Sequence, residues 1–547
     1  MIKNYSLLLL AGSLAFGQST QLTGQSALAV NEVVPFTSAI AFQGVAETQA
    51  FYGEAEYEVF PDTQDGILDK PIILVDGFDP SDSRNTSMIY QMLNYGGGQN
   101  LADDLRAQGF DIIILNFPNY TRATDGAQIA GGADYIQRNA MNLVELLETV
   151  NAAKVGDEKN VVIGPSMGGL ISRYALRYME MNGMEHDTRL YLSFDSPHKG
   201  ANFPIGFQHL FNYMANGPLG DPTLAEMIDT MLKSPASNQM LIDHLDGHLA
   251  AGDAVEFNPA ITLPTGKPAF RNAFQSELDA MGFPQTTRNV AISNGSGSDA
   301  ANGTPGQVVM NHTFYMDAST RGIVNLNFTP YAGQTSQVSR FRGEINLVFF
   351  WLTIYDSAAS SQAPAASDGL DAGPGGRFNF SSLADEAAGS GMMEEFFNNL
   401  QISYFNFIPT FSSLAVENVT NWHMTVDASQ TPFDAVYIPA ENENHVTLTP
   451  ENVAFALSEI LVPLGINKNE LKGIVVRNPF GNSFDIYSGT TLPNTSITVV
   501  DMLGKTVFEQ HGLTLDGVVS IPVELNSGMY FMTIENGGKS VVKKIVK

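Results

Sequence analysis

A serine between two glycines, in the segment Gly164-Pro165-Ser166-Met167-Gly168, has the G-x-S-x-G spacing. An apolar run at 161–163 precedes this segment, and a helical pattern at 170–181 follows it. Such a strand–turn–helix context presents the serine hydroxyl at a sharp turn, and the glycines avoid collisions with neighbouring elements. The free N–H groups at the start of the following helix point to the same place. We therefore predict that Ser166 is the nucleophile of a covalent mechanism.

A serine nucleophile needs two hydrogen-bond donors for the oxyanion of its tetrahedral intermediate. The first candidate is the backbone N–H of Met167, directly after the serine. The second is the N–H of Phe78 in Val75-Asp76-Gly77-Phe78, because this turn follows an apolar run that predicts an earlier strand. An ordinary Asp-Gly turn is the alternative interpretation of this segment.

The general base is predicted by elimination among the nine histidines. With this serine motif, the histidine follows the nucleophile and the acid in chain order. His445 fits because it precedes a helical pattern at 450–461, with Thr449 as N-cap and Pro450 at the first helical position. For His423, ahead of a strand-like run, a core or surface role is favoured.

Several carboxylates compete for the third position, which orients the histidine. Asp434 lies on a predicted turn before His445 and has the expected chain order, so it is favoured. Asp195 ends the strand after the nucleophile strand and remains the alternative acid, because a triad is defined by geometry rather than by sequence position. Asp427 and Glu441 are also near His445 in the sequence.

This chemistry requires no cofactor and no metal. The chain has no cysteine, which excludes thiolate nucleophiles, zinc–thiolate sites and iron–sulfur clusters. Asp368 and Asp371 lack the further oxygen ligands of a calcium loop, so residues 367–376 are predicted to form a flexible acidic loop.

Four apolar runs are expected to form the sheet that positions these residues: 72–75, 112–115, 161–163 and 190–194. They do not alternate with polar residues, which is typical of buried parallel strands covered by helices. An amphipathic pattern at 133–150 predicts one of those helices. The fold class is therefore α/β, and residues 18–64 are expected to add strands to the same sheet.

The core is predicted at residues 65–200 and 401–465, interrupted by residues 201–400. An insertion of that size must form its own subdomain, and we expect a lid with an acyl pocket. Methionine and aromatic residues such as Phe349, Phe350 and Trp351 suit irregular apolar chains. Residues 469–547 alternate short strands with turns, which predicts a small immunoglobulin-like β-sandwich.

The N-terminus has the pattern of a signal peptide at residues 1–17. Lys3 precedes an apolar stretch at 7–14, and Ala15-Phe16-Gly17 offers a small-x-small cleavage site. The stretch is too short to span a bilayer, so no transmembrane segment is expected in the mature protein. The net charge of −29 over 547 residues excludes nucleic acid as a favoured partner.

Three segments, 71–80, 164–169 and 194–200, resemble the corresponding blocks of lipase-like serine esterases of the α/β-hydrolase superfamily. The last contains Ser196-Pro197-His198-Lys199-Gly200, and the resemblance implies a structural role for His198. The chain departs from the family at Asp76, where histidine is usual, and Asp434 matches the family's acid motif only loosely. The resemblance implies an α/β-hydrolase fold and a lipid or other ester as substrate.

The C-terminal segment resembles the type A sorting domain of the type IX secretion system of Bacteroidetes. The shared features are Asn478-Pro479-Phe480, residues 500–505, residues 527–531 and the closing residues 543–547. This resemblance implies the secretion machinery as a partner, and export followed by release or attachment at the cell surface.

The predicted function is that of a secreted serine hydrolase that cleaves acyl esters. Acyltransferase or peptidase activity on the same triad is an alternative, because acceptor choice depends on pocket shape. A surface binding or adhesion protein with an inactive hydrolase fold is a third interpretation.

Overall fold

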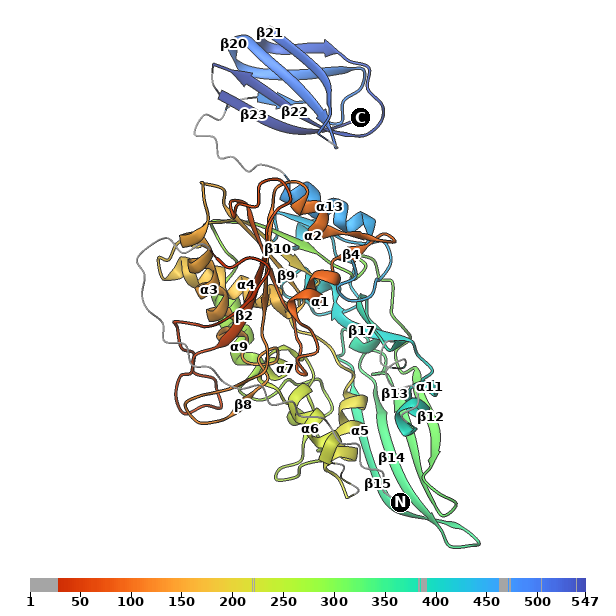
Figure 1. The fold of residues 1–547 in the computed structure, drawn as a ribbon. Helices are drawn as coiled ribbons and strands as arrows, with labels where there is room; N and C mark the ends of the chain where they lie inside the picture. Colours follow the sequence, from red (N-terminus) through yellow and green to blue (C-terminus); the bar gives the residue numbers. More distant parts are fainter. Residues whose placement is uncertain are drawn as a thin grey trace. The chain divides into compact units, whose positions relative to one another are not determined.

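The computed structural model describes residues 28–547 except 219, 221, 382–383, 385–390, 462–470, 472–473, 503 and 538. The chain divides into two units, one ending at Leu461 and the other beginning at Val462 (Figure 1). The predicted signal peptide lies outside the described residues. Among the described residues, no helix is both long and apolar enough to cross a bilayer.

An eight-stranded sheet forms the centre of the first unit. Its strands, in spatial order, are β1 (Val33–Thr37), β2 (Glu54–Phe60), β6 (Asp111–Asn116), β3 (Pro71–Val75), β9 (Asn160–Pro165), β10 (Thr188–Phe194), β11 (Arg288–Ile292) and β18 (Ala435–Tyr437). The strands from β6 to β18 pair in parallel, whereas β1 and β2 are antiparallel additions from residues 28–64. The α/β fold class is confirmed, and the four predicted strands are β3, β6, β9 and β10.

Helices cover both faces of this sheet (Figure 1). Helices α3 (Ile136–Ala153) and α4 (Met167–Met181) pack on one face, against side chains such as Val162. Helices α1 (Thr86–Gln91), α2 (Leu101–Arg106) and α13 (Pro450–Ile460) pack on the other, against Val161 and Ile163. The alternation follows from the two-residue period of a strand, and it explains why these strands are apolar throughout.

Strand β11 corrects the expected domain boundaries. It lies inside residues 201–400, yet it pairs with both β10 and β18 in the central sheet. The sequence prediction overlooked this short strand because the surrounding region is rich in Gly, Asn and Pro. The segment therefore divides into parts before and after a core strand.

The part before β11 is helical, with α5 (Ile205–Asn216), α6 (Pro222–Met231), α7 (Pro235–Met240), α8 (Leu245–His248) and α9 (Arg271–Met281). The part after it forms an antiparallel sheet of β12 (Val308–Tyr315), β13 (Thr320–Asn327), β14 (Thr335–Asn346) and β15 (Trp351–Gln362). Further on lie β16 (Gly375–Asn379), α11 (Met392–Asn398), β17 (Tyr404–Pro409) and α12 (Thr410–Ser413). Phe349 and Phe350, which we expected in an acyl pocket, are instead exposed at the tip between β14 and β15.

The predicted flexible loop at 367–376 is wrong. A 3-10 helix, η1 (Leu370–Ala372), and the start of β16 occupy this stretch. The carboxylate of Asp371 is buried and accepts hydrogen bonds from the Thr329 N–H at 2.8 Å and from the Asn202 amide at 3.1 Å. Acidic and small residues here serve internal hydrogen bonding, which composition alone could not reveal.

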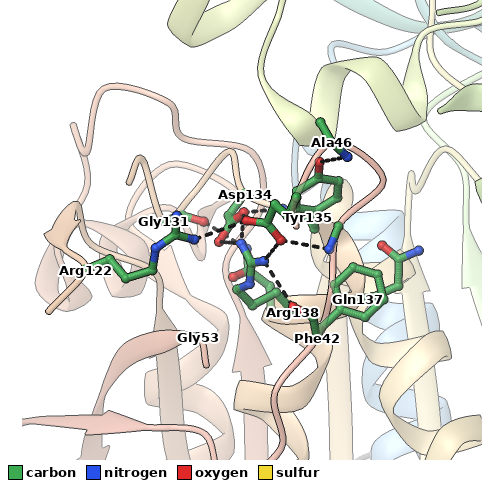
Figure 2. A network of polar contacts seen from close by, with 12 residues as sticks. Phe42, Ala46, Gly53, Arg122, Gly131, Asp134, Tyr135, Gln137 and Arg138 are labelled. Atoms are coloured by element: carbon green, nitrogen blue, oxygen red, sulfur yellow. Dashed lines mark hydrogen bonds and ion pairs between the residues drawn. The ribbon is translucent and has the colours of Figure 1, made fainter. Parts of the chain in front are cut away.

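A buried ionic network, the Arg138 network, joins the N-terminal segment to α3 (Figure 2). It contains Arg138, Asp134, Glu47 and Arg122. Arg138 Nη1 donates to both Asp134 oxygens, at 2.8 and 2.9 Å, and Nη2 donates to the Phe42 carbonyl at 3.1 Å. Glu47 pairs with both arginines. The network thereby fastens the loop between β1 and β2 onto the main body.

The second unit is all-β. Its strands are β19 (Ile474–Val476), β20 (Ser483–Asp501), β21 (Thr506–Pro522), β22 (Met529–Asn536) and β23 (Lys539–Val546), and β20 pairs with β19, β21 and β22. Phe484, Ile497 and Met532 belong to its own fully buried core. This unit therefore has the hydrophobic interior of a separate domain.

Candidate active site

Ser166 lies at the sharp turn between β9 and α4. Its backbone φ of 53° is in the left-handed region, which is strained for a residue with a side chain. A Cβ added to Gly164 would come within 2.5 Å of the Gly168 carbonyl oxygen, and one on Gly168 within 2.3 Å of the Val75 carbonyl oxygen. The two glycines of the motif therefore allow the backbone contacts that hold this turn.

His445 lies on the loop between β18 and α13, and its Nε2 is 2.9 Å from Ser166 Oγ. Its backbone N–H donates to the Arg377 carbonyl at 2.9 Å. Its ring packs edge-on against the ring of Phe407, with the two ring centroids 5.0 Å apart. The following helix begins with a capping box on Thr449 and with proline in its first turn. These local contacts hold the imidazole over the serine.

Asp195 directly follows β10 and completes the hydrogen-bonded chain. Its Oδ2 lies 2.7 Å from His445 Nδ1, and its Oδ1 accepts the Asn294 N–H at 3.0 Å. The residue is fully buried, and a Cβ on Gly376 would come within 2.1 Å of Oδ2. The carboxylate is thus enclosed, with a hydrogen-bond partner on each oxygen.

The structure does not bring Asp434 to His445, which corrects our preference between the two carboxylates. Asp434 precedes β18, and its Oδ2 accepts the Asn289 N–H at 2.7 Å. Since β18 is parallel to β11, β10 and β9, Asp434 lies at the amino ends of these strands. Ser166 and Asp195 follow carboxyl ends, so the two carboxylates lie at opposite edges of the sheet.

The loop after β3 approaches Ser166 closely. A Cβ on Gly77 would be 3.2 Å from the Ser166 Cβ, so only glycine fits here comfortably. Asp76 is held by Arg84, whose Nε and Nη2 donate to its two oxygens at 3.2 and 3.0 Å. The same Nη2 also donates to the Phe78 carbonyl at 3.0 Å. Arg84 therefore braces the loop that carries the predicted Phe78 donor.

The electrostatics of this loop follow from burial. Burial raises the pKa of Asp76, while the nearby Arg84 guanidinium opposes the rise. On the other side of the serine, Met167 is the first residue of α4, so its N–H has no intrahelical acceptor. The sequence analysis missed Arg84, because an arginine shortly after an Asp-Gly turn is only a weak signal of such a role.

Asn294 is another site residue that the sequence analysis missed. It follows β11, and its side-chain amide donates to Glu443 Oε2 at 2.7 Å and to the Thr447 carbonyl at 3.0 Å. It therefore links the Asp195 carboxylate to the loop that carries His445. Burial raises the pKa of Glu443, the hydrogen bond from Asn294 opposes this rise, and the negative charge of Asp195 adds to it.

The other histidines near the core make different contacts. His198 is fully buried with its Nε2 2.8 Å from Ser193 Oγ, and burial lowers its pKa well below the ordinary value. His423 Nε2 lies 2.9 Å from the Gly369 carbonyl oxygen. Within the described part of the chain, no group of three or more metal-ligating side chains comes together.

Each unit contains a segment that matches a known family. Residues 91–179 match the family described as alpha/beta hydrolase fold, and residues 477–547 match the secretion system C-terminal sorting domain. The chain therefore contains an α/β-hydrolase domain followed by a type IX sorting domain. It is a secreted or cell-surface protein. None of the curated proteins compared with it matches.

Solved structures that match parts of this chain include hydrolases and an esterase. A serine hydrolase without a lid from Xanthomonas campestris is 16% identical, with 32% of this chain and 65% of that chain covered and a TM-score of 0.21. An esterase from Pyrobaculum calidifontis is 9% identical, with 48% and 66% covered and a TM-score of 0.24. A peroxisomal alpha-beta-hydrolase from Saccharomyces cerevisiae is 12% identical, with 48% and 73% covered and a TM-score of 0.25. The chain spans just under two thirds of the first two structures.

Proposed function

We propose that this protein is a secreted serine hydrolase that cleaves carboxylic esters through an acyl-enzyme intermediate. Ser166 is the nucleophile, His445 the general base and acid, and Asp195 the group that orients His445. The observation that carries the proposal is the continuous chain from Ser166 Oγ through His445 to Asp195, with links of 2.9 and 2.7 Å. Three different segments of the chain converge to make it.

In the first half of the reaction, Ser166 Oγ attacks the ester carbonyl while His445 Nε2 takes its proton. The carbonyl oxygen becomes an oxyanion, which the N–H groups of Met167 and Phe78 stabilise. Asp195 holds His445 with Nδ1 protonated, so that Nε2 is free to accept the proton, and it stabilises the imidazolium. His445 then protonates the leaving alkoxide, and the acyl group remains on Ser166.

In the second half, water replaces the alcohol. His445 removes a proton from the water, which attacks the acyl-serine carbonyl. The second tetrahedral intermediate collapses to the carboxylic acid, and His445 returns the proton to Ser166.

A fluorophosphonate probe and p-nitrophenyl esters test this proposal together. We expect stoichiometric labelling of Ser166, located by peptide mass spectrometry, and loss of ester hydrolysis in proportion to labelling. The Ser166→Ala variant serves as the control and is expected to take up no label. Absence of both labelling and hydrolysis in the folded wild type would contradict the proposal and favour a binding protein with an inactive hydrolase fold.

A further inference from the structure

An apolar cavity lies on the face of the central sheet that α1, α2 and α13 cover. It encloses about 750 Å³ of space between the atoms, counting open solvent at its mouth. Its walls are mainly aliphatic, with Ile72, Leu74, Ile112 and Leu192 from the strands and Leu105 from α2. An apolar lining of this kind favours an apolar ligand, because binding removes apolar surface from water.

One end of the cavity lies beside the candidate active site. Asp76, Pro165 and Val446 line this end, and they are the sequence neighbours of Gly77, Ser166 and His445. From Asp76, directly after β3, the cavity continues along alternate residues of this strand, Leu74 and Ile72. At about 3.3 Å per strand residue, this path spans roughly 13 Å.

Two small residues on the covering helices leave this space open. Ala102 of α2 and Ala456 of α13 both line the cavity and are almost completely buried. A larger side chain at either position would extend into the space between helix and sheet.

From this arrangement we infer that the cavity between the sheet and helices α1, α2 and α13 receives the acyl chain of the substrate. The inference rests on the proposed function and names its substrate class, esters of medium-length or long aliphatic acids. It places the acyl site within the core layer and not beneath the region 201–400, where we expected it from the sequence. Each methylene that enters should raise kcat/KM by up to about fourfold.

The test narrows the cavity from two different helices. In Ala102→Leu and Ala456→Leu, we expect the ratio of kcat/KM for p-nitrophenyl decanoate to that for the acetate to fall at least tenfold. Ala107→Leu is the matched control, because Ala107 is exposed at the end of the same α2 helix. Thermal denaturation verifies that each variant is folded, and using both positions guards against misfolding of one.

Binding without turnover separates this inference from the proposed function. Calorimetry is expected to show that decanoic acid binds the Ser166→Ala variant. Adding Ala102→Leu or Ala456→Leu to this variant is expected to weaken decanoic acid binding. Suppose that the wild-type protein cleaves acetate esters but that Ala102→Leu and Ala456→Leu change neither the chain-length preference nor decanoate binding. The proposed acyl site is then overturned, whereas the proposed hydrolase activity is not. If decanoate binds as described but no ester is cleaved, the cavity is supported as an acyl-binding site and the proposed hydrolase function is contradicted.

A second feature, independent of the cavity, is the apolar tip between β14 and β15. Leu347, Val348, Phe349 and Phe350 are 42%, 83%, 93% and 58% exposed. An apolar run this exposed is uncommon in soluble domains and marks an interaction site. The Asn346 N–H donates to the Ser319 carbonyl at 2.7 Å, so the turn after β12 lies beside this tip.

Aromatic and charged side chains adjoin the tip. Trp351 follows the two phenylalanines in the sequence, and its ring centroid lies 6.4 Å from that of Tyr315. Arg321 is opposite Tyr315 in the strand register, stacks 4.1 Å from the Trp351 ring centroid and pairs with Glu344. An apolar tip with Trp, Tyr and Arg directly beside it is typical of segments that insert into a bilayer surface, where these three residue types lie at the headgroup level.

The geometry points to insertion of this tip into a neutral or zwitterionic lipid surface. A flat protein partner would leave a convex phenylalanine tip partly wet, whereas acyl chains close around it. The net charge of −29 disfavours anionic lipid, so apolar insertion must supply the affinity.

Vesicles of phosphatidylcholine provide the test. We expect the wild type to cosediment with them at low and high salt alike, with a blue shift of tryptophan fluorescence. The double variant Phe349→Asp/Phe350→Asp is expected to abolish both the cosedimentation and the blue shift. Val155→Asp, at an exposed apolar residue outside the tip, is expected to keep both. Unchanged binding by the double variant, or dimerisation that the double variant removes in the absence of any vesicle binding, would overturn the inference.

Discussion

Asp195 and Asp134 are both shielded from solvent, at 0% and 3% exposed, and each bonds to a nitrogen-bearing side chain. The partner of Asp195 is His445, whose other nitrogen reaches the half-buried Ser166. The partner of Asp134 is Arg138, whose guanidinium continues to Glu47 and to a backbone carbonyl (Figure 2). One carboxylate therefore begins a path to a reactive group, and the other belongs to a network of ion pairs.

The difference lies in the proton chemistry of the partner. Histidine gains and loses a proton near neutral pH, whereas arginine stays charged in proteins. Burial raises the pKa of Asp134, and Arg138 opposes that rise. A buried carboxylate by itself is thus no indicator of catalysis. What decides its use is whether its partner can titrate and also contacts a nucleophile. The following predictions test this contrast.

The largest effect is expected for Ser166→Ala. The kcat for ester hydrolysis should fall about 10⁴-fold or more, because the nucleophile is lost. The melting temperature should not fall, since the strained turn gains nothing from the hydroxyl and no large cavity forms. A variant that keeps a tenth of the wild-type kcat would refute the role of Ser166.

Asp195→Asn should lower kcat by about 10⁴-fold, because the amide favours the wrong imidazole tautomer. Asp434→Asn is the matched control at the opposite edge of the sheet and should change kcat less than about threefold. Steady-state kinetics on one p-nitrophenyl ester compare the two. A larger loss for Asp434→Asn would restore the preference that the sequence suggested.

Arg84→Lys tests an arginine–aspartate pair that lies beside the site. Lysine cannot bridge both Asp76 oxygens and the Phe78 carbonyl, so the Phe78 N–H should move. We expect kcat to fall up to about 100-fold with little change in KM, since a small misplacement at the reacting centre is costly. If instead KM rose and kcat/KM fell by the same factor while kcat stayed unchanged, Arg84 would have a role in binding only.

Arg138→Met should leave the kcat of the folded enzyme unchanged but lower the free energy of unfolding by about 3–5 kcal/mol, because Asp134 stays buried without its partner. Denaturant unfolding measures the loss. The control is Arg340→Met in the exposed pair with Asp356, where a loss of about 0–1 kcal/mol is expected. Similar losses in both variants would show that the Arg138 network is no stronger than a surface pair.

Truncation after Leu461 should have the smallest effect on catalysis. Every residue of the proposed site precedes this point, and the second unit has its own core. The purified truncated enzyme should hydrolyse esters like the full chain, yet remain inside the producing cell. Normal export without residues 462–547 would contradict the role of the sorting domain.

Much of the fold was predictable because its signals are local. The apolar runs at β3, β6, β9 and β10 predict buried parallel strands, and the three- and four-residue spacing of apolar residues in α3 predicts a helix. The strand β11 was missed because it is only five residues long and lies in a region rich in Gly, Asn and Pro. The acidic stretch at 367–376 was misjudged because its polarity serves buried hydrogen bonds to residues far along the chain.

By itself the sequence determined a serine on a glycine-flanked turn between strand and helix, and a histidine just ahead of a helix capped by Thr449. Spacing, capping and turn formation act within a few residues, so the local sequence encodes them. Only the tertiary structure decided between Asp195 and Asp434. The parallel pairing of β10, β11 and β18 decides which edge of the sheet each carboxylate occupies. The same pairing brings Asp195 into contact with His445, which lies 250 residues further along the chain.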